Sequence, residues 1–417
     1  MASIKHMKRL HQNLEENLSW YKKWHESKSH KAVHYGVLLV ALVFAVSMII
    51  TSSQSSAAGT YYVSTTGNDN NTGLSTITAW RTLAKACNTV TTAGDTIHIV
   101  AGTYTETAKC YLAKGVSVEG EGKANTIVKT TMTGTWSDYM SLESPDGTNG
   151  NQSISNFTLD GQANTSGNQS GTWYGIWVTA RSNVSVHDMK LINFYMAGAI
   201  FVGNHLDGQT ATTWTAGPYA TGNSFYNNEG ANCAAVDGII GGGSGCLMIG
   251  WQDGMQVHHN TLITTARPVS HNGWPIKYFS NGFLKGVKIH DNTFIKSPFQ
   301  GTSPWAPPDW DFAVEFFNVQ GMEFNNNYIQ GSVDINYVYK GTYPYGLWAH
   351  HNTLDHATPN YSHAESGFIF EFKAEDIIVE NNNINNVGVG ISYNTRYPAN
   401  TGGYNYPCGT GGCSAIL

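Results

Sequence analysis

The chain has 417 residues, which is enough for one large repeat domain or two ordinary domains. Only 12% of the residues are charged, against about a quarter in average globular domains, while Gly numbers 45 and aromatics reach 12%. This mixture is typical of short β-strands joined by many turns, and it excludes a helix bundle rich in Ala, Glu, Lys and Leu. Residues 36–417 hold 16 Lys/Arg and 26 Asp/Glu, so they are a poor candidate for binding nucleic acid through its phosphates.

The N-terminal segment predicts export. Residues 1–35 hold seven Lys/Arg and three Asp/Glu and predict a charged, helical tail, and residues 36–50 form an apolar run without charge. Small residues follow up to position 58, so 36–58 is a signal peptide or, if the run extends back to about 20 residues, an uncleaved membrane anchor. Both interpretations leave residues 1–33 in the cytoplasm. We therefore expect 59–417 to be secreted or anchored on the extracytoplasmic face of the membrane.

Six cysteines fit an oxidising compartment. They lie in pairs that are close in sequence, although six cysteines allow about 15 pairings in all. The sequence-close pairing is Cys87/Cys110, Cys233/Cys246 and Cys408/Cys413. No CxxC motif occurs, which disfavours a zinc site built on cysteine.

Residues 60–104 predict a strand, a Gly/Asn loop, an amphipathic helix and a second strand. Trp80, Leu83, Ala84 and Cys87 lie at i, i+3, i+4 and i+7, one face of a helix that could cover the open end of a solenoid. The motifs YYVS, TGND, AW, TL and GDTI of this segment resemble the opening of secreted right-handed parallel β-helix proteins of the pectate-lyase-like superfamily. The resemblance implies an all-β, single-stranded right-handed parallel β-helix, but no particular activity, because this fold hosts lyases, hydrolases, epimerases and adhesins.

A repeat in the second half predicts the same architecture. Each unit has a short apolar strand, a polar corner and another strand. The third corner residue is an asparagine in five successive units: Asn260, Asn292, Asn327, Asn352 and Asn382. Repeats of this length without a helical period are typical of solenoids, in which each repeat forms one coil. We interpret the corner asparagines as a stacked ladder in αL geometry, and the adjacent His258, His259, His290, His350 and His351 as surface corner residues rather than metal ligands. Upstream, 137–150 is polar and Gly-containing and predicts a loop.

Candidate catalytic residues lie in the second half. Glycoside hydrolysis needs two carboxylates, and Glu315 and Glu371 are 56 residues apart, or two coils. Stacked in register they would be roughly 9.6 Å apart, near the upper end of the inverting range. We expect both to face outward, with Asp311 beside them, although ordinary solvated side chains would give the same pattern.

Lys277 supports a second reaction. A partly desolvated lysine can act as the base in β-elimination from a uronic acid, with Arg267 nearby to neutralise the carboxylate. The resemblance to related lyases implies a Ca²⁺ held by Asp or Glu, but no cluster of Asp residues matches such a site, so Ca²⁺ is expected only if the protein is a lyase. No other cofactor or metal is predicted.

Four aromatic residues predict a sugar-binding surface: Trp274, Tyr278, Trp305 and Trp310. Sugar rings stack on aromatic faces, although Pro-Trp loops can also simply pack on the coil. The leading hypothesis is an exported enzyme that cleaves a polysaccharide through Lys277, Asp311, Glu315 and Glu371, with hydrolysis favoured over elimination because acids outnumber bases. The alternative is a non-catalytic, surface-displayed β-helix that binds polysaccharide or acts as an adhesin, with residues 36–50 uncleaved in the membrane.

Overall fold

The computed structural model describes part of the chain in detail. The described residues are 14–19, 22–23, 58–132, 137–163, 171–203, 219–234, 245–264, 267–271, 282–296, 312–355, 366–387 and 389–393. The chain divides into two units, Met1–Ala57 and Ala58–Leu417, and the described residues of the first are helical. Within the described part, no helix is both long and apolar enough to cross a membrane; the apolar run 36–50 lies outside it.

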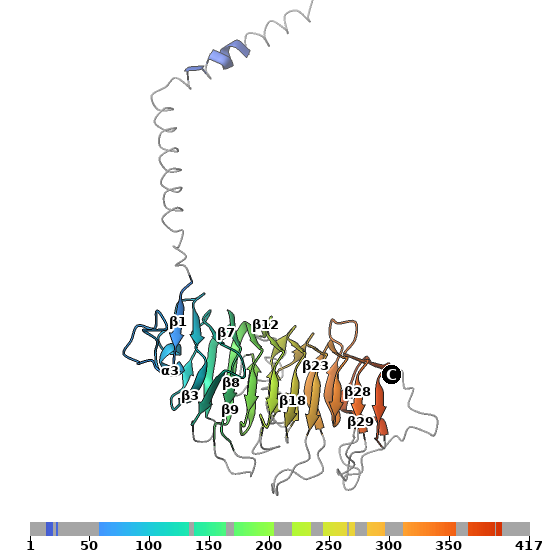
Figure 1. Cartoon of the computed structure of the whole chain (residues 1–417). Helices are drawn as coiled ribbons and strands as arrows, with labels where there is room; N and C mark the ends of the chain where they lie inside the picture. The colour runs from blue at the N-terminus through green and yellow to red at the C-terminus, as the bar shows by residue number, and fades with distance from the viewer. Residues whose placement is uncertain are drawn as a thin grey trace, which may run out of the picture. The chain divides into compact units, whose positions relative to one another are not determined.

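The second unit is a parallel β-helix, as the sequence predicts (Figure 1). Its described strands form one sheet of 22 and one of 10, and strands pair in parallel with their counterparts in neighbouring coils. The larger sheet contains β1 (Thr60–Val63), β2 (Thr96–Ile99), β4 (Cys110–Tyr111), β5 (Ser117–Gly120), β7 (Asp138–Ser155), β9 (Tyr174–His187), β11 (Ala197–Val202), β12 (Ala220–Thr221), β13 (Ser224–Tyr226), β15 (Gly245–Gly250), β16 (Gln252–Asp253), β17 (Gln256–His258), β19 (Arg267–His271), β20 (Leu284–Lys285), β21 (Lys288–His290), β23 (Phe312–Gln320), β24 (Met322–Asn325), β26 (Ser332–Tyr339), β27 (Leu347–His350), β29 (Ser366–Ala374), β30 (Ile377–Glu380) and β32 (Val389–Tyr393). The smaller sheet contains β3 (Gly102–Glu106), β6 (Thr126–Thr130), β8 (Thr158–Asp160), β10 (Lys190–Ile192), β14 (Glu229–Ala231), β18 (Thr261–Thr264), β22 (Thr293–Lys296), β25 (Tyr328–Gln330), β28 (Thr353–Asp355) and β31 (Asn383–Asn385).

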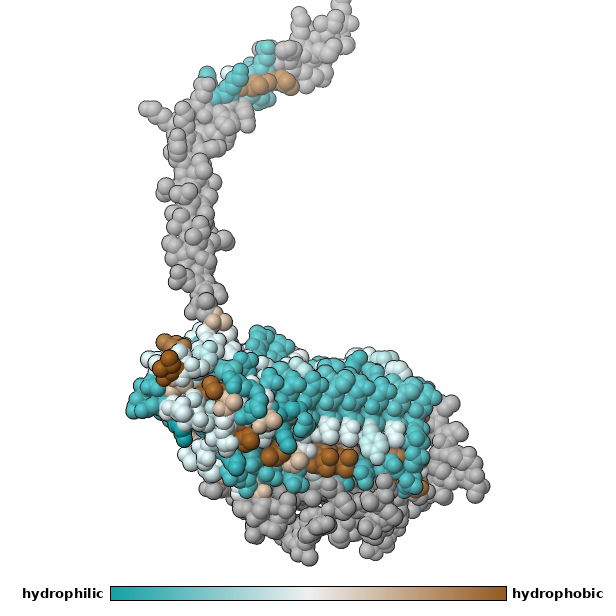
Figure 2. Space-filling model, viewed as in Figure 1, coloured by the Kyte–Doolittle hydropathy of each residue, from teal (hydrophilic) through white to brown (hydrophobic). Residues whose placement is uncertain are grey.

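One continuous core fills the interior of the coils. Alternate strand residues point inward, so that Val257, Ile289, Phe324 and Ala349 stack in register and are fully buried. Each large apolar side chain buried in this way contributes about 1.5–3 kcal/mol. The outer surface in view in Figure 2 carries a long hydrophilic band with smaller hydrophobic patches.

The asparagine ladder is confirmed, and it begins one coil earlier than predicted. Its members are Asn228, Asn260, Asn292, Asn327, Asn352 and Asn382. Each side-chain amide donates to the next side-chain oxygen, at 3.1 Å in the first step and 2.9 Å in the other four. The same oxygen accepts the preceding asparagine's backbone N–H, so the amide groups bond consecutive coils inside the corner.

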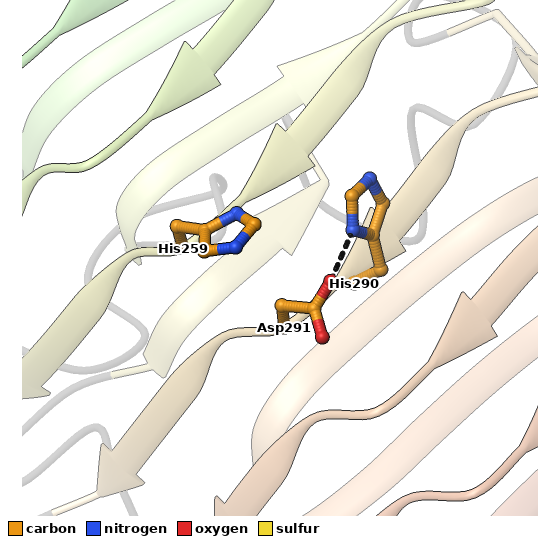
Figure 3. A group of neighbouring side chains, drawn as sticks. All are labelled: His259, His290 and Asp291. Atoms are coloured by element: carbon orange, nitrogen blue, oxygen red, sulfur yellow. Dashed lines mark hydrogen bonds and ion pairs between the residues drawn. The ribbon is translucent and has the colours of Figure 1, made fainter.

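The left-handed residue of each corner is not the ladder asparagine, so that detail of the prediction is wrong. The residue just before it has the positive φ: 55° at His259, 55° at Asp291 and 54° at His351. Asn, Asp and His tolerate this conformation better than most residues, which explains why they recur there. Figure 3 shows two such corner residues on neighbouring coils.

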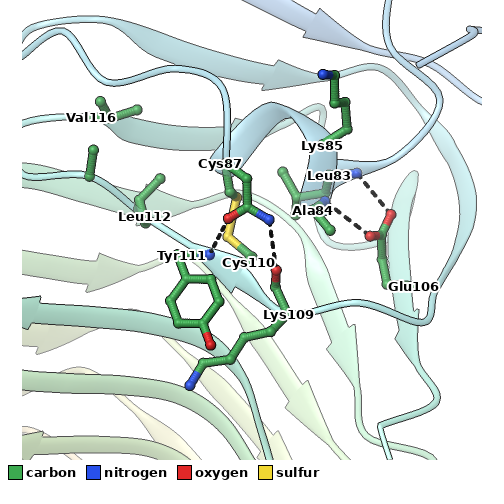
Figure 4. The surroundings of a disulfide bond; sticks show 12 residues. Leu83, Ala84, Lys85, Cys87, Glu106, Lys109, Cys110, Tyr111, Leu112 and Val116 are labelled. Carbon is green, nitrogen blue, oxygen red and sulfur yellow. Dashed lines mark hydrogen bonds between the residues drawn. A yellow bond between two sulfur atoms is a disulfide. The ribbon is translucent and has the colours of Figure 1, made fainter. Parts of the chain in front are cut away.

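A short helix, α3 (Leu83–Cys87), lies near the start of the unit (Figure 4). The carboxylate of Glu106 accepts hydrogen bonds from the backbone N–H groups of Leu83 and Ala84, at 2.8 and 3.0 Å. Two predicted disulfides are confirmed, Cys87–Cys110 and Cys233–Cys246, and the third pair lies outside the described residues. The helix is shorter than the predicted pattern, and its capping role stays a prediction.

One predicted loop is wrong. Residues 138–150 belong to β7, which pairs with β9 through two register shifts. The polar and Gly-containing composition of this stretch suggested a turn, but the long ladder to β9 supplies the backbone hydrogen bonds that outweigh local propensity.

Candidate active site

Six of the eight predicted site residues lie outside the described residues: Lys277, Asp311, Trp274, Tyr278, Trp305 and Trp310. Glu315 is described in full, and Glu371 is described by its place in strand β29. The structure therefore addresses the predicted site through Glu315 and through the residues beside it.

Glu315 faces away from the core, as predicted, but it is not solvated. Its neighbours Val314 and Phe316 both belong to the core, so strand alternation turns Glu315 to the outer face. Only 5% of the residue is accessible. Its register partners are Ser270 on β19 and Asp334 on β26, which also alternate with core residues and are buried. We call Ser270, Glu315 and Asp334 the acidic row.

Arg267 pairs with Glu315. Its Nε lies 3.0 Å from Oε2 of Glu315, and the two side chains are 2% and 7% accessible. The guanidinium carbon lies 6.0 Å from the ring centre of Phe312. A buried carboxylate is rare without a partner, and this ion pair supplies one.

Asp334 brings a second carboxylate next to Glu315. The two residues are direct register partners on adjacent strands, so their backbones are about 4.8 Å apart. Asn336 donates from Nδ2 to Oδ2 of Asp334 at 3.1 Å and is itself fully buried. Among the described residues, Oγ of Ser270 and Oδ1 of Asn336 have no hydrogen-bond partner although both are buried.

The expected stacking of Glu315 on Glu371 is wrong in register. The two strands are separated by one strand, β26, as the two-coil spacing predicts. However, Glu371 pairs with Asn336, while Glu315 pairs with Asp334, so the two glutamates are offset by two residues along the strand. Two strand spacings and two residues separate their backbones by roughly 12 Å.

The acidic row follows three apolar residues in the same register stack. In the preceding coils the same register positions hold Trp177, Ile200 and Met248. Ile200 and Met248 belong to a second apolar cluster outside the main core, and Trp177 packs against it. The change from apolar to acidic side chains within one stack marks these coils as chemically distinct.

A second polar group lies at the ladder corner. The rings of Tyr226, His258 and His290 stack on successive coils, with centroids 5.0 Å apart in each step. Burial and the neighbouring histidines lower the pKa of His258. Nδ1 of His290 lies 2.8 Å from Oδ2 of Asp291.

The sequence does not predict the pairing of Asp334 with Glu315, nor the places of Ser270 and Asn336 beside them. It does single out Arg267, but with a substrate carboxylate as the expected partner in place of Glu315. The signal for Asp334 is its place in VDI, where it alternates with two apolar residues, just as Glu315 does in VEF.

Comparison with known proteins finds structural similarity alone. No protein-family model matches the chain, and no curated protein matches it. A GH136 lacto-N-biosidase from Eubacterium ramulus is 12% identical over 78% of this chain and 68% of its own, with a TM-score of 0.44. Pectate lyase Pel9A is 13% identical over 79% and 80%, with a TM-score of 0.40, and the polygalacturonase of Erwinia carotovora ssp. carotovora is 12% identical over 82% and 85%, with a TM-score of 0.44. Matches this distant do not indicate what this chain acts on.

Proposed function

We propose that the protein is an exported carbohydrate-active enzyme that hydrolyses a polysaccharide with Glu315 and Asp334 as its catalytic carboxylates. The observation that carries the proposal is the acidic row, in which two buried acids occupy adjacent strands on the outer face of the coils. Burying two acids side by side opposes folding unless partners compensate, so a purely structural role would be served better by apolar residues such as those of the preceding coils.

The strand spacing favours one stereochemical course. Retaining glycosidases place their two carboxyl groups about 5–5.5 Å apart, and inverting enzymes about 6.5–9.5 Å apart. Adjacent strands are about 4.8 Å apart, so side chains of Glu315 and Asp334 that leave the sheet in parallel would hold their carboxyl groups near the retaining separation. This revises the inverting geometry expected for Glu315 with Glu371.

The surroundings suggest a division of roles. The guanidinium of Arg267 stabilises the ionised form of Glu315, which suits a nucleophile. The like charge of Glu315 disfavours ionisation of its neighbour, so Asp334 suits the proton donor to the leaving oxygen. Lys277, Asp311 and Glu371 remain predicted contributors, and Trp274, Tyr278, Trp305 and Trp310 remain predicted to stack on sugar rings.

The test combines activity with stereochemistry. The purified protein is incubated with a panel of neutral and acidic polysaccharides, and new reducing ends are measured together with the ultraviolet absorbance of unsaturated uronides. We expect reducing ends without that absorbance, and retention of configuration in the first product. Glu315→Gln and Asp334→Asn should each lower kcat by about 10²–10⁴-fold. Glu323→Gln changes a carboxylate on β24 that pairs with Lys288, outside the acidic row, and should leave kcat unchanged.

Each alternative has its own outcome. Inversion of configuration would rule out the Glu315–Asp334 pair, and unsaturated products would indicate a lyase, with Ca²⁺ then to be tested. The near-complete burial of Asp334 favours a second candidate, a non-catalytic β-helix that displays or binds polysaccharide and uses the acidic row as a structural ion-pair network. Binding to a polysaccharide without any cleavage, unchanged in Glu315→Gln, would establish that candidate instead.

A further inference from the structure

The corner next to the asparagine ladder brings two imidazoles and a carboxylate together. His259 comes from one coil, and His290 and Asp291 come from the next, since His258 and His290 are direct register partners. One donor atom from each of His259, His290 and Asp291 lies within 4.8 Å of the others. Figure 3 shows the ring of His259 directed toward the His290–Asp291 pair.

Although the sequence favours surface corner residues over metal ligands here, we propose that His259, His290 and Asp291 bind one divalent transition-metal ion of the Zn²⁺ class, which clips two neighbouring coils together. Ligands about 2.0–2.1 Å from one ion are about 3.0–3.4 Å from each other. Nδ1 of His290 and Oδ2 of Asp291 are already 2.8 Å apart, so this pair needs only a small adjustment. The donor atom of His259 lies within 4.8 Å of both, so the corner must contract slightly on binding, and water completes the coordination at this exposed corner.

The scaffold holds the ligands in place. Nδ1 of His258 lies 2.9 Å from Nδ1 of His259, a hydrogen bond that orients the His259 ring and leaves its other nitrogen for the ion. The ring of His258 stacks on that of His290 with an interplanar angle of 9°. Because His259 and Asp291 both have φ of 55°, their side chains leave equivalent corners of stacked coils in the same direction.

The donor set selects the ion. Imidazole nitrogen with a carboxylate oxygen suits Zn²⁺, Cu²⁺, Ni²⁺ and Fe²⁺, whereas Ca²⁺ and Mg²⁺ prefer sites made of oxygen alone. The site therefore differs in chemistry from the Ca²⁺ expected of a lyase. It also lies on β17, β21 and their corners, away from the acidic row on β19, β23 and β26, so it does not depend on the proposed activity.

Other corners serve as internal comparisons. His187 and Asp188 form the same pair at 2.8 Å, but the next coil offers Tyr226 and Asn227 in place of histidines. His350 and His351 repeat the double-histidine corner at 2.8 Å, but the adjacent coils place asparagine at its left-handed position. Among the described residues, only the corner of His259, His290 and Asp291 places three such donors together.

The experiment is a Zn²⁺ titration by calorimetry of the full chain, purified without a histidine tag and treated with chelator. His259→Asn removes a ligand. Asparagine has the same left-handed conformation at the equivalent corners, at Asn227, Asn326 and Asn381, so the substitution suits the backbone. We expect His259→Asn to lose one bound Zn²⁺, or to bind it at least about 10-fold more weakly. Asp291→Asn, the residue found at the next corner, should give the same loss.

The matched control is His351→Asn, which changes the second double-histidine corner and should bind Zn²⁺ within twofold of the wild type. Circular dichroism of the metal-free variants, unchanged from the wild type, shows that the coil is intact. The proposal is overturned if the wild type binds no Zn²⁺, if His259→Asn and Asp291→Asn both bind it as the wild type does, or if equimolar Ca²⁺ displaces it.

Discussion

Replacing Asn292 by alanine tests how much the ladder stabilises the coils. Oδ1 of Asn292 accepts from the backbone N–H of Asn260 at 3.0 Å and from Nδ2 of Asn260 at 2.9 Å. Its own Nδ2 donates to the carbonyl of Val257 at 3.0 Å, to the carbonyl of His290 at 2.9 Å and to Oδ1 of Asn327 at 2.9 Å. Asn292→Ala removes all five interactions from a site that is 2% accessible.

The expected cost follows from the groups left behind. Two donors of Asn260 lose their acceptor, and an unsatisfied buried polar group costs about 1–3 kcal/mol. The carbonyl of Val257 loses a donor as well, while a water molecule entering the vacated space could replace part of the loss. We therefore expect local destabilisation by about 2–5 kcal/mol, at the upper end of what single substitutions do.

Hydrogen exchange followed by mass spectrometry measures the destabilisation around Asn292 locally. A local measurement is needed because a long repeat array need not unfold in one step. In peptides covering 256–264 and 288–296, the protected amides should exchange at least about 30-fold faster, the equivalent of about 2 kcal/mol. The control is Asn382→Ala at the end of the ladder, where the side chain is only half-buried and water can replace the lost partners. Acceleration below about fivefold for Asn292→Ala, or an equal effect of Asn382→Ala, would refute the reasoning.

Two further predictions concern charged groups. Arg267→Met should destabilise the protein by about 3–5 kcal/mol, because it leaves the buried carboxylate of Glu315 without its guanidinium; an unchanged denaturation midpoint would show that the pair contributes nothing. Burial lowers the pKa of His98, but hydrogen bonds to Glu121 and Glu119 and their charges outweigh it, so the pKa is raised. The wild type should therefore melt above His98→Gln below about pH 6.5, and this advantage should disappear as the pH rises through the raised pKa. A difference in Tm that is the same at pH 6 and pH 9 would contradict the assignment.

The coil architecture could be predicted from the sequence because it depends on local repetition. Each corner repeats an apolar strand, two polar residues and an asparagine, and each copy makes the same bonds to the next coil. The prediction of the left-handed residue is wrong by one position, because Asn, Asp and His all tolerate positive φ and the sequence alone does not show which of three polar residues turns the chain. The polar composition of residues 138–150 predicts a loop, but tertiary pairing with β9 outweighs it.

The acidic row could be predicted only in part, because coil length varies between the corner and the outer face. Steps along the asparagine ladder take 25 to 35 residues. Steps along the acidic row take 45 residues from Ser270 to Glu315 and only 19 from Glu315 to Asp334. A spacing measured at the corner therefore predicts how many strands separate two residues, but not their register on another face.

That difference decides which carboxylates can act together. The predicted separation of two coils between Glu315 and Glu371 is confirmed, and it places their strands about 9.6 Å apart. An offset of two residues displaces them by about a further 6.6 Å along the strand direction. The short step to Asp334 instead places two acids on adjacent strands with no offset, and Arg267 compensates the charge of one of them. Two carboxyl groups can act together more readily when their backbones are about 4.8 Å apart than when they are roughly 12 Å apart. The register therefore favours Glu315 with Asp334 as the pair to test for catalysis.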